Sequence, residues 1–573
     1  MFLLLTLIIT IPAFISLLNP WYFSMHDFQH IARLFLLDTG IHQGSLFPRW
    51  VDLLGFNFGY PLFNFYPPLI YYISEIFRLL GATYVWSIKS MIIAGYLVGA
   101  VGVYLLGRKL FSTNIAAVLA AALFTFFTYH ATLVYVRGAF AEFWGMNLLP
   151  YAFLALELVR ERKSLRSAVW FGVAFALIML SHVFVGFPFV LLCGVYVLLM
   201  IPWEDKKIRF LVKTLLGGIL GLGVSAFFWL PSMVERSYTL VDTILTRELA
   251  SYRIHFVQPI QFWYSPWGYG GSGAGFADGM SFQLGKIHIV IMLASVLLFS
   301  WGLMRKKISA PIARTFGIYT ILLLSTLFLA TEYSRGVWDT IPQLQYLQFP
   351  WRMLSFTGLF ISIVGAYAVD YMPSILGKRY RGALQYIFTL LIIGVLGMQY
   401  GKYFRPSEYI AKHDGALTSF QELAWKVSGS SFEFSPRGVP LKKSRYDTSI
   451  FDIEEKNVPK QSYQVYADNA QVTPRVTHFN EKTFLVESPQ NTMFQLNTFY
   501  FPGWVATIDG APVEINATNR YRLIRIQVPS GSHSLEFRFE DTPIRKTANV
   551  VSVLTVAGMI LLLGVGQLKK RKA

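Results

Sequence analysis

The sequence predicts a polytopic α-helical membrane protein that carries an antiparallel β-sandwich near its C-terminal end. Of the 573 residues, 54% are hydrophobic and only 14% are charged, and the mean hydropathy is +0.46. Apolar runs of near-membrane length recur up to about residue 400, and one more follows near the C-terminus. Between them, residues 401–548 are more polar and alternate in the way of β-strands.

The apolar runs predict about 12 to 13 membrane helices, in a transmembrane region over residues 1–400 and a last helix within 549–573. The segment 168–201 is short for two crossings, because each crossing needs about 20 residues. Residues 69–80 are too short and too polar to cross, so we expect an interfacial or re-entrant helix there. The runs cover residues 2–19, 86–106, 115–130, 143–159, 168–182, 184–201, 213–230, 285–304, 313–330, 353–371, 384–400 and 549–567.

The first run could also be a signal peptide by its length. No basic residue precedes it and no small-residue cleavage site follows it, which favours a retained first helix. The single cysteine, Cys193, lies within an apolar run, so we expect neither a disulfide framework nor a cysteine metal site.

Basic residues indicate how the helices are oriented. One set of loops, near residues 108, 160–166, 206–213, 305–314, 378–381 and 569–572, holds 21 Lys and Arg, and the alternate short loops hold 3. By the positive-inside rule the first set faces the cytoplasm, together with both termini. The long loops 20–85, 231–284 and 401–548 then lie outside. The same distribution accounts for the net charge of +18 without a nucleic-acid partner.

The first outer loop carries the most site-like pattern, His26-Asp27-Phe28-Gln29-His30, an acid between two imidazoles. Prolines and glycines follow at a density that fixes turns. An acid held next to the end of a membrane helix is a site candidate. His26 and His30 would share one face of a helix, which suits a divalent metal, but two imidazoles and one acid are a weak metal signal.

The orientation was derived from Lys and Arg in short loops, yet it places several other polar groups on the side of Asp27. These are His26, Arg137, Glu142, His182 and Arg352. Each also has a structural interpretation: Arg137 and Glu142 as interfacial anchors, His182 as a packing residue, and Arg352 as an anchor in the aromatic belt. Their common side nevertheless predicts a shared site.

The C-terminal region shows six strand patterns, with turns at Asp509-Gly510 and Ser530-Gly531. Alternation with such turns predicts an antiparallel sandwich, which would lie outside between two membrane helices. In loop 231–284 the aromatic and glycine-rich tract 261–271 is typical of either an aromatic belt or a mobile lid. The strand patterns cover residues 462–466, 483–487, 493–497, 504–508, 523–528 and 535–539.

Several motifs resemble those of prokaryotic membrane proteins described as 6-pyruvoyl-tetrahydropterin synthase-related. In the first outer loop they are His26-Asp27-x-x-His30, Phe47-Pro48-Arg49-Trp50 and Phe65-Tyr66-Pro67-Pro68. Further on they are Arg137-Gly138-Ala139-x-Ala141-Glu142, Ser181-His182 and Gln348-Phe349-Pro350-Trp351-Arg352. Nothing in the chain resembles the soluble pterin enzyme. The C-terminal Tyr500-Phe501-Pro502-Gly503-Trp504, the Asp509-Gly510 turn and Pro529-Ser530-Gly531-Ser532-His533 resemble YfhO-type membrane proteins.

Both groups are similar to the GT-C superfamily of membrane glycosyltransferases. That resemblance implies a sugar donor linked to polyprenyl phosphate, and an acid of the first outer loop at the reaction centre. Asp27 is the position that matches this acid. The family acid is often part of a two-acid pattern, whereas Asp27 is flanked by His26 and Phe28, so a divalent metal is possible and no cofactor is certain.

We therefore expect a GT-C-type glycosyltransferase that transfers a sugar to an acceptor hydroxyl at the outer face of the cell membrane. The acceptor would be a glycan, a lipid or a protein. The alternative is a non-catalytic flippase or transporter of lipid-linked glycans, or a cell-envelope assembly scaffold; we detect no internal repeats with broken helices, which would favour a transporter. The expected roles are Asp27 as base, His26 or His30 as its orienting group, Arg352 and then Arg137 as phosphate ligands, and Glu142, His182 and Arg49 as further substrate-binding residues.

Overall fold

The computed structural model describes residues 1–244, 251–376, 381–445 and 448–571, and side chains outside 373–381 and 565–571. Residues 245–250, in the expected loop 231–284, lie outside the described residues. The same holds for the basic side chains expected at 378–381 and 569–572.

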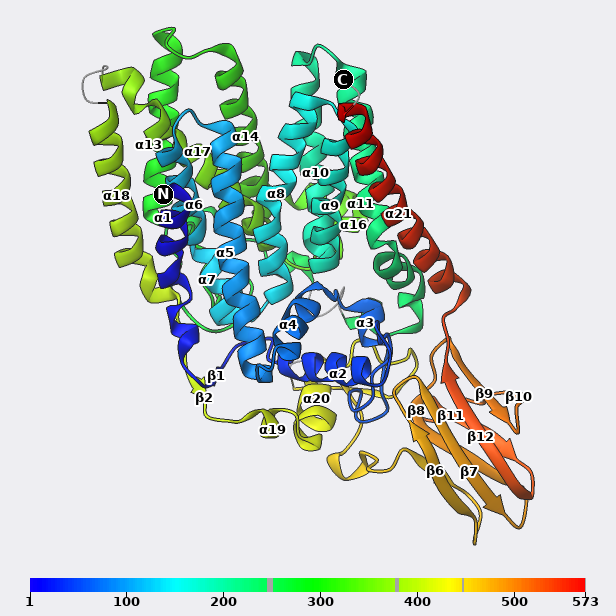
Figure 1. The fold of residues 1–573 in the computed structure, drawn as a ribbon. Coiled ribbons are helices and arrows are strands. Elements are labelled where there is room, and N and C mark those ends of the chain that lie inside the picture. The colour runs from blue at the N-terminus through cyan, green and yellow to red at the C-terminus, as the bar shows by residue number, and fades with distance from the viewer. Residues whose placement is uncertain (245–250, 377–380, 446–447, 572–573) are drawn as a thin grey trace.

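All twelve apolar runs are helical, which confirms the polytopic helical fold class (Figure 1). Eight of these helices are long and apolar enough to cross a membrane within the described ranges, or nine if one bent pair counts as a span. The helices are α1 (Phe2–Thr10), α5 (Tyr84–Leu110), α6 (Asn114–Thr125), α8 (Phe140–Arg162), α9 (Leu165–Ser181), α10 (Val183–Met200), α11 (Lys207–Glu235), α13 (Lys286–Met304), α14 (Ala310–Ala330), α17 (Leu354–Leu376), α18 (Arg381–Tyr400) and α21 (Pro543–Arg571).

The expected 12 to 13 spans thus exceed the number that meets the length and hydropathy requirement. The helices α1 and α9 are short, and α9 has only 17 residues. The 23 residues of α8 include buried Glu142, Asn147 and Glu157, which lower its hydropathy. Polar side chains inside the bundle therefore account for part of the difference, and such residues mark functional regions of membrane proteins.

The first outer loop is more helical than its composition suggests. It contains α2 (His30–His42), α3 (Leu62–Phe65) and α4 (Leu69–Leu79), which lie across one end of the bundle (Figure 1). Residues 30–42 contain no proline, so this stretch continues as a helix between the turns on either side. The predicted short helix at 69–80 is confirmed as α4.

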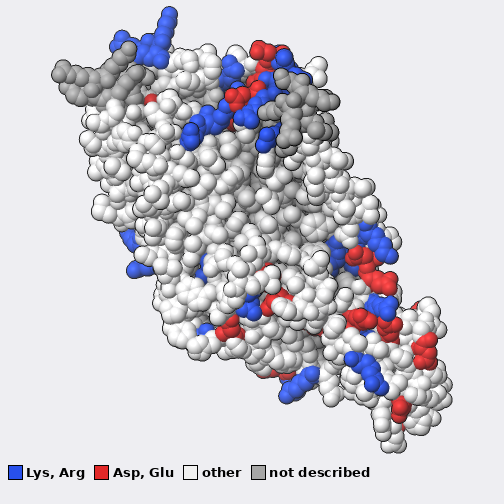
Figure 2. All heavy atoms as spheres, viewed as in Figure 1, with Lys and Arg blue, Asp and Glu red and all other residues white. Residues whose placement is uncertain are grey.

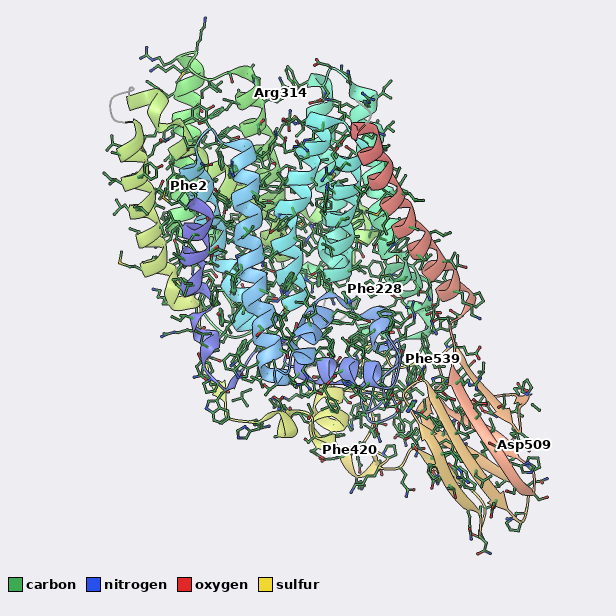
Figure 3. The ribbon with its side chains drawn as sticks, viewed as in Figure 1. Phe2, Phe228, Arg314, Phe420, Asp509 and Phe539 are labelled. Atoms are coloured by element: carbon green, nitrogen blue, oxygen red, sulfur yellow. The ribbon has the colours of Figure 1, made fainter. Side chains whose placement is uncertain are left out.

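Charged residues are concentrated at the two ends of the bundle (Figure 2). Figure 2 shows Lys and Arg gathered at the end opposite the sandwich, with a broad belt of uncharged surface between the ends. In Figure 3, Arg314 lies at that basic end, and Asp509 lies at the far side of the sandwich. Among the described side chains, Lys109 pairs with Glu161, Lys163 pairs with Glu204, and Arg314 lies over Trp203, so the basic loops near these residues share one end. Which end faces the cytoplasm remains a prediction.

Two antiparallel sheets form the predicted sandwich, with strand orders β10-β9-β12-β7-β6 and β11-β8-β5. Phe494 of one sheet packs on Phe484 and Phe537 of the other, with ring centroids 5.1 and 5.7 Å apart. All six predicted strands are present, and β6 and β10 were not foreseen. The strands are β5 (Tyr463–Val465), β6 (Gln471–Thr477), β7 (Glu481–Ser488), β8 (Thr492–Phe499), β9 (Trp504–Ile508), β10 (Ala511–Val513), β11 (Leu523–Val528) and β12 (Gly531–Phe539).

A buried ion pair ties the sandwich to the bundle. Arg545, at the start of α21, is fully buried, and its Nε donates to Glu235 Oε2 of α11 at 2.9 Å. Its Nη2 donates to the Pro502 carbonyl of the sandwich at 2.8 Å. One guanidinium thus joins the sandwich, α21 and α11.

The orientation can be tested with single cysteines in a Cys193→Ser background. Because Cys193 is buried, replacing it does not alter the surface of the protein, and the introduced cysteine is then the only thiol that can be labelled. We expect Glu514→Cys on the sandwich to react with a membrane-impermeant thiol reagent added to intact cells. Arg162→Cys at the basic end should react only after the cells are opened. The reverse labelling pattern would contradict the orientation.

Candidate functional site

Asp27 lies in a turn that pairs with the chain just before α8. The His26 amide donates to the Val136 carbonyl at 3.0 Å, and the Asp27 amide donates to the Arg137 carbonyl at 2.8 Å. Gly138 follows with φ +67°, and a Cβ there would lie 2.5 Å from the Met25 sulfur. Glycine is therefore required where the two segments meet. This pairing places Asp27 next to Arg137.

The Asp27 carboxylate is partly exposed and ionised. Its side chain is 38% exposed, and its Oδ1 lies 2.8 Å from His26 Nδ1. Burial acts to raise the pKa of Asp27, but the hydrogen bond from His26 and the charges of His26 and Arg137 outweigh it and lower the pKa to about 2. The same hydrogen bond raises the pKa of His26. The hydrogen bond between His26 and Asp27 therefore favours the charged form of both side chains.

Both ring nitrogens of His30 contact protein groups. It is buried as the first residue of α2, and its Nε2 donates to the Gly138 carbonyl at 2.5 Å, so Nδ1 accepts from the Tyr71 hydroxyl at 3.1 Å. Burial lowers its pKa to about 4, consistent with a neutral ring. Because His26 precedes α2, the idea that both imidazoles share a helix face is wrong. Within the described ranges, no three or more His, Cys, Asp or Glu are placed to hold a metal ion.

Arg137 reaches the site at the end of a broken helix. After α6 ends, the chain bends by 46° and continues through α7 (Thr128–Ala131) and a π-helical turn, Thr132–Arg137. The expected loop 131–142 is wrong, because only Gly138 and Ala139 separate this turn from α8. π-helical turns often occur at functional sites because they redirect side chains out of the regular helix.

Arg137 and Arg352 share one buried carboxylate, Glu142. Glu142 Oε2 lies 2.8 Å from Arg137 Nη1 and 3.3 Å from Arg352 Nε. Its Oε1 accepts from the Tyr129 hydroxyl at 2.6 Å and from the Ser355 hydroxyl at 3.1 Å. Two guanidiniums and one carboxylate leave this buried cluster with a positive charge in excess.

Arg352 is held at the start of α17. Gln348 adopts φ +64°, and Pro350 then opens a short 3-10 turn that contains Arg352. Arg352 Nη1 donates to the Leu347 carbonyl at 2.8 Å, and the guanidinium lies over Phe349 at 5.0 Å. Phe349 of the motif thus packs against the charge and helps to fix its position.

Asp27 is joined to Arg137 by the backbone pairing, and Arg137 to Arg352 through Glu142. His182 packs on Phe184, over which the Arg352 guanidinium also lies, so the structure brings these predicted site residues into one region. His182 joins α9 to α10, and among the described residues nothing accepts from or donates to its Nδ1. His130 Nε2 and His288 Nδ1 are buried without a partner in the same way among the described residues, so this feature is compatible with both a packing role and a substrate role of His182.

Sequence reasoning missed a second carboxyl group beside Asp27. Glu433 lies in the segment before the sandwich and interacts electrostatically with Asp27; burial raises its pKa. Buried Arg33 of α2 lies 4.0 Å from Glu433 and donates to the Ser431 hydroxyl at 3.1 Å. No sequence pattern connects Glu433 with Asp27, because they are far apart along the chain.

Arg49 belongs to a different cluster from Asp27. It is 5% exposed and donates to Asn64 at 3.0 Å, to the Phe227 carbonyl at 2.8 Å and to Asn549 at 3.0 Å. Its Nε also pairs with Asp541 at 3.4 Å. These partners lie on α3, α11 and the start of α21, at the junction with the sandwich.

The architecture is that of a helical membrane protein with a β-sandwich at one end. Residues 63–400, more than half of the chain, match the family described as "6-pyruvoyl-tetrahydropterin synthase related domain; membrane protein", and the chain belongs to this family. The match includes Arg137, Glu142, His182 and Arg352, but it begins after Asp27. No curated protein matches the sequence.

Solved structures with a similar arrangement include two kinds of membrane transferase. The oligosaccharyltransferase of Archaeoglobus fulgidus in its apo form is 13% identical, with a TM-score of 0.47, over 72% of this chain and 56% of that chain. Its complex with an inhibitory peptide and a dolichol-phosphate is 11% identical, with a TM-score of 0.47, over the same shares. The arabinofuranosyltransferase AftD from Mycobacteria is 14% identical, with a TM-score of 0.44, over 71% of this chain and 27% of that chain. The chain thus covers about half of the first protein and about a quarter of AftD.

The shared carboxylate predicts that Glu142→Gln destabilises the protein. The substitution keeps the shape but leaves two buried guanidiniums without a compensating charge, which costs about 3–5 kcal/mol for a broken buried pair. Unfolding of the purified protein in detergent measures the change. Glu161→Gln on the same helix is the control; its half-exposed ion pair with Lys109 should contribute less than about 1 kcal/mol. Equal stability of the two variants would contradict the buried cluster.

Proposed function

We propose that this protein is a membrane glycosyltransferase that moves a sugar from a polyprenyl-phosphate-linked donor to an acceptor hydroxyl. The reaction would take place at the end of the bundle that carries the sandwich, facing the outside of the cell. The observation that carries the proposal is a partly exposed, ionised Asp27 beside two arginines that share one buried carboxylate. The motif resemblance to GT-C enzymes supports the same assignment.

The reaction is a displacement at the anomeric carbon. The bond from that carbon to the phosphate oxygen breaks, and a bond to the acceptor oxygen forms. The hydroxyl proton passes to a base, and the electron pair of the broken bond stays on the polyprenyl phosphate. Such a step needs a base near the hydroxyl and positive charge near the leaving group.

Asp27 is the proposed base, because it is ionised and remains accessible to solvent. His26 would orient it through the 2.8 Å contact, and His30 would hold the turn rather than touch substrate. As His26 loses its proton, the carboxylate becomes more basic, since both the hydrogen bond and the charge that lower its pKa weaken.

Arg352 and Arg137 are the proposed ligands of the leaving phosphate. A guanidinium presents planar paired donors that match phosphate oxygens. Glu142 is fully buried and its partners are protein groups, so we assign it as a positioning residue that acts through both arginines. His182 retains the role of a sugar or acceptor ligand. The acceptor class, whether glycan, lipid or protein, follows from none of these contacts.

One observation favours the transporter alternative. The bent pair of α6 and the segment Thr128–Arg137 is a broken span or a re-entrant segment, and such segments line substrate sites in transporters. A transporter would move a lipid-linked glycan without breaking the sugar–phosphate bond. Release of polyprenyl phosphate from the donor therefore separates the two functions.

Asp27→Asn tests the proposed base. Asparagine keeps the size of the side chain but cannot accept the proton, so transfer should fall by about 10²–10⁴-fold. Release of polyprenyl phosphate from a panel of polyprenyl-phosphate sugars, with protein in nanodiscs, measures the rate. Asp468→Asn, an exposed acid of the sandwich, should behave like the wild type. Full activity of Asp27→Asn would remove Asp27 from the mechanism.

Arg352→Lys tests a phosphate ligand against a belt anchor. Lysine keeps the charge and can still pair with Glu142, but it lacks the planar donors that match phosphate oxygens. We expect donor use to weaken with little change in melting temperature, and Arg352→Ala to be worse. Arg335→Lys, half exposed and paired with Glu332, is the matched control. Unchanged donor affinity and rate in both Arg352 variants would return the phosphate role to Arg137.

A further inference from the structure

A cavity of about 420 Å³ lies where the sandwich meets the bundle. The Phe47-Pro48-Arg49-Trp50 motif of the first outer loop lines one part of it, and Phe479 and Phe539 of the sandwich line another. Phe539 marks this junction in Figure 3. No residue of the Asp27 and Glu142 cluster takes part in its lining, so it is a separate feature of the molecule.

Four of the residues that line the cavity are aromatic. Trp50 and Phe479 are buried, whereas Phe47 and Phe539 are partly exposed. Trp50 packs against Phe539 and against Trp504, with ring centroids 5.2 and 5.3 Å apart. Trp50 and Phe479 therefore support the wall from behind, and the ring surface open to a ligand is that of Phe47 and Phe539.

Charged groups in the wall balance each other. Arg49 pairs with Asp541 at 3.4 Å, and exposed Lys546 and Glu540 complete two positive and two negative groups. Burial lowers the pKa of Arg49 to about 10, which leaves it charged at neutral pH. A wall with no net charge does not select an anion such as a free phosphate or a lipid headgroup. It favours a neutral ligand with many hydroxyl groups.

We propose that this cavity is a second carbohydrate site, which binds a short stretch of an uncharged glycan. A sugar ring has apolar C–H faces that pack on aromatic rings, and hydroxyls that bond to groups such as Asn480 and Glu540. The cavity volume lies within the range of small-molecule sites, about 300–1,000 Å³. Arg49, expected to bind substrate, lines this cavity and not the Asp27 cluster, and because protein groups already hold its guanidinium it would position the wall rather than bond to the glycan. This binding does not depend on the proposed transfer.

Calorimetric titration of the full-length protein in nanodiscs tests the site. The probes are neutral malto-, manno-, galacto- and arabino-oligosaccharides, with inorganic phosphate and an acidic peptide as other ligand classes. We expect at least one oligosaccharide to bind and the two charged probes not to compete with it. Glu540→Gln and Asn480→Ala should each weaken binding by about tenfold, the effect of a lost hydrogen bond to a polar ligand.

Three further variants sharpen the result. Glu514→Gln makes the same chemical change at an exposed acid of the sandwich outside the cavity, and should bind like the wild type. Ser45→Trp should fill the cavity and abolish binding without lowering the melting temperature. Asp27→Asn should bind normally, so loss of transfer and loss of binding are distinguishable. The proposal is overturned if no oligosaccharide binds, if binding survives Ser45→Trp, or if phosphate or peptide displaces the glycan.

Discussion

The candidate site depends on a single buried carboxylate, that of Glu142. It contacts Arg137 before α8, Arg352 at the start of α17, and Tyr129 in the broken helix. A buried charge is tolerated only when it is paired and hydrogen-bonded, so these elements must stay together for Glu142 to remain ionised. The same requirement holds the two guanidiniums close to each other, although like charges would otherwise separate them. Packing of the bundle holds Glu142 in place, and Glu142 in turn holds the two positively charged guanidiniums near Asp27.

Both arginines that contact Glu142 lie next to irregular backbone. Arg137 ends a π-helical turn and is followed by Gly138 in the left-handed region, and Arg352 follows Gln348, which also has positive φ. A π-helical turn and a non-glycine residue at positive φ, such as Gln348, are unfavourable in isolation and persist only where their surroundings determine them. Here the surroundings are the ion cluster itself and the aromatic rings of Trp351 and Phe349, over which the two guanidiniums lie. The distortions and the charge cluster therefore stabilise each other.

Local patterns explain what the sequence could predict. The apolar runs become helices and the six alternating segments become strands, because period and length depend on neighbouring residues only. The common side of Asp27, Arg137 and Arg352 followed from loop charges, and the structure places them in one region. Sequence could not reveal the break after α6, which depends on packing, or the approach of Glu433 to Asp27, which depends on tertiary contact. It also could not separate Arg49 from Asp27, since both belong to one loop.

That separation has a geometric consequence. Asp27 precedes α2, and the Phe47-Pro48-Arg49-Trp50 motif follows it, so α2 is the rigid element between the proposed transfer site and the cavity. Gly40 of this helix already lines the cavity, so the part of α2 between the two sites runs from His30 to Gly40 and is about 15 Å long at about 1.5 Å per residue. A glycan that occupied both sites at once would have to extend over that length, which a single sugar cannot do. The two proposals together therefore favour an extended glycan acceptor over a small lipid acceptor, because only an extended chain would gain from binding in the cavity while its end lies at Asp27.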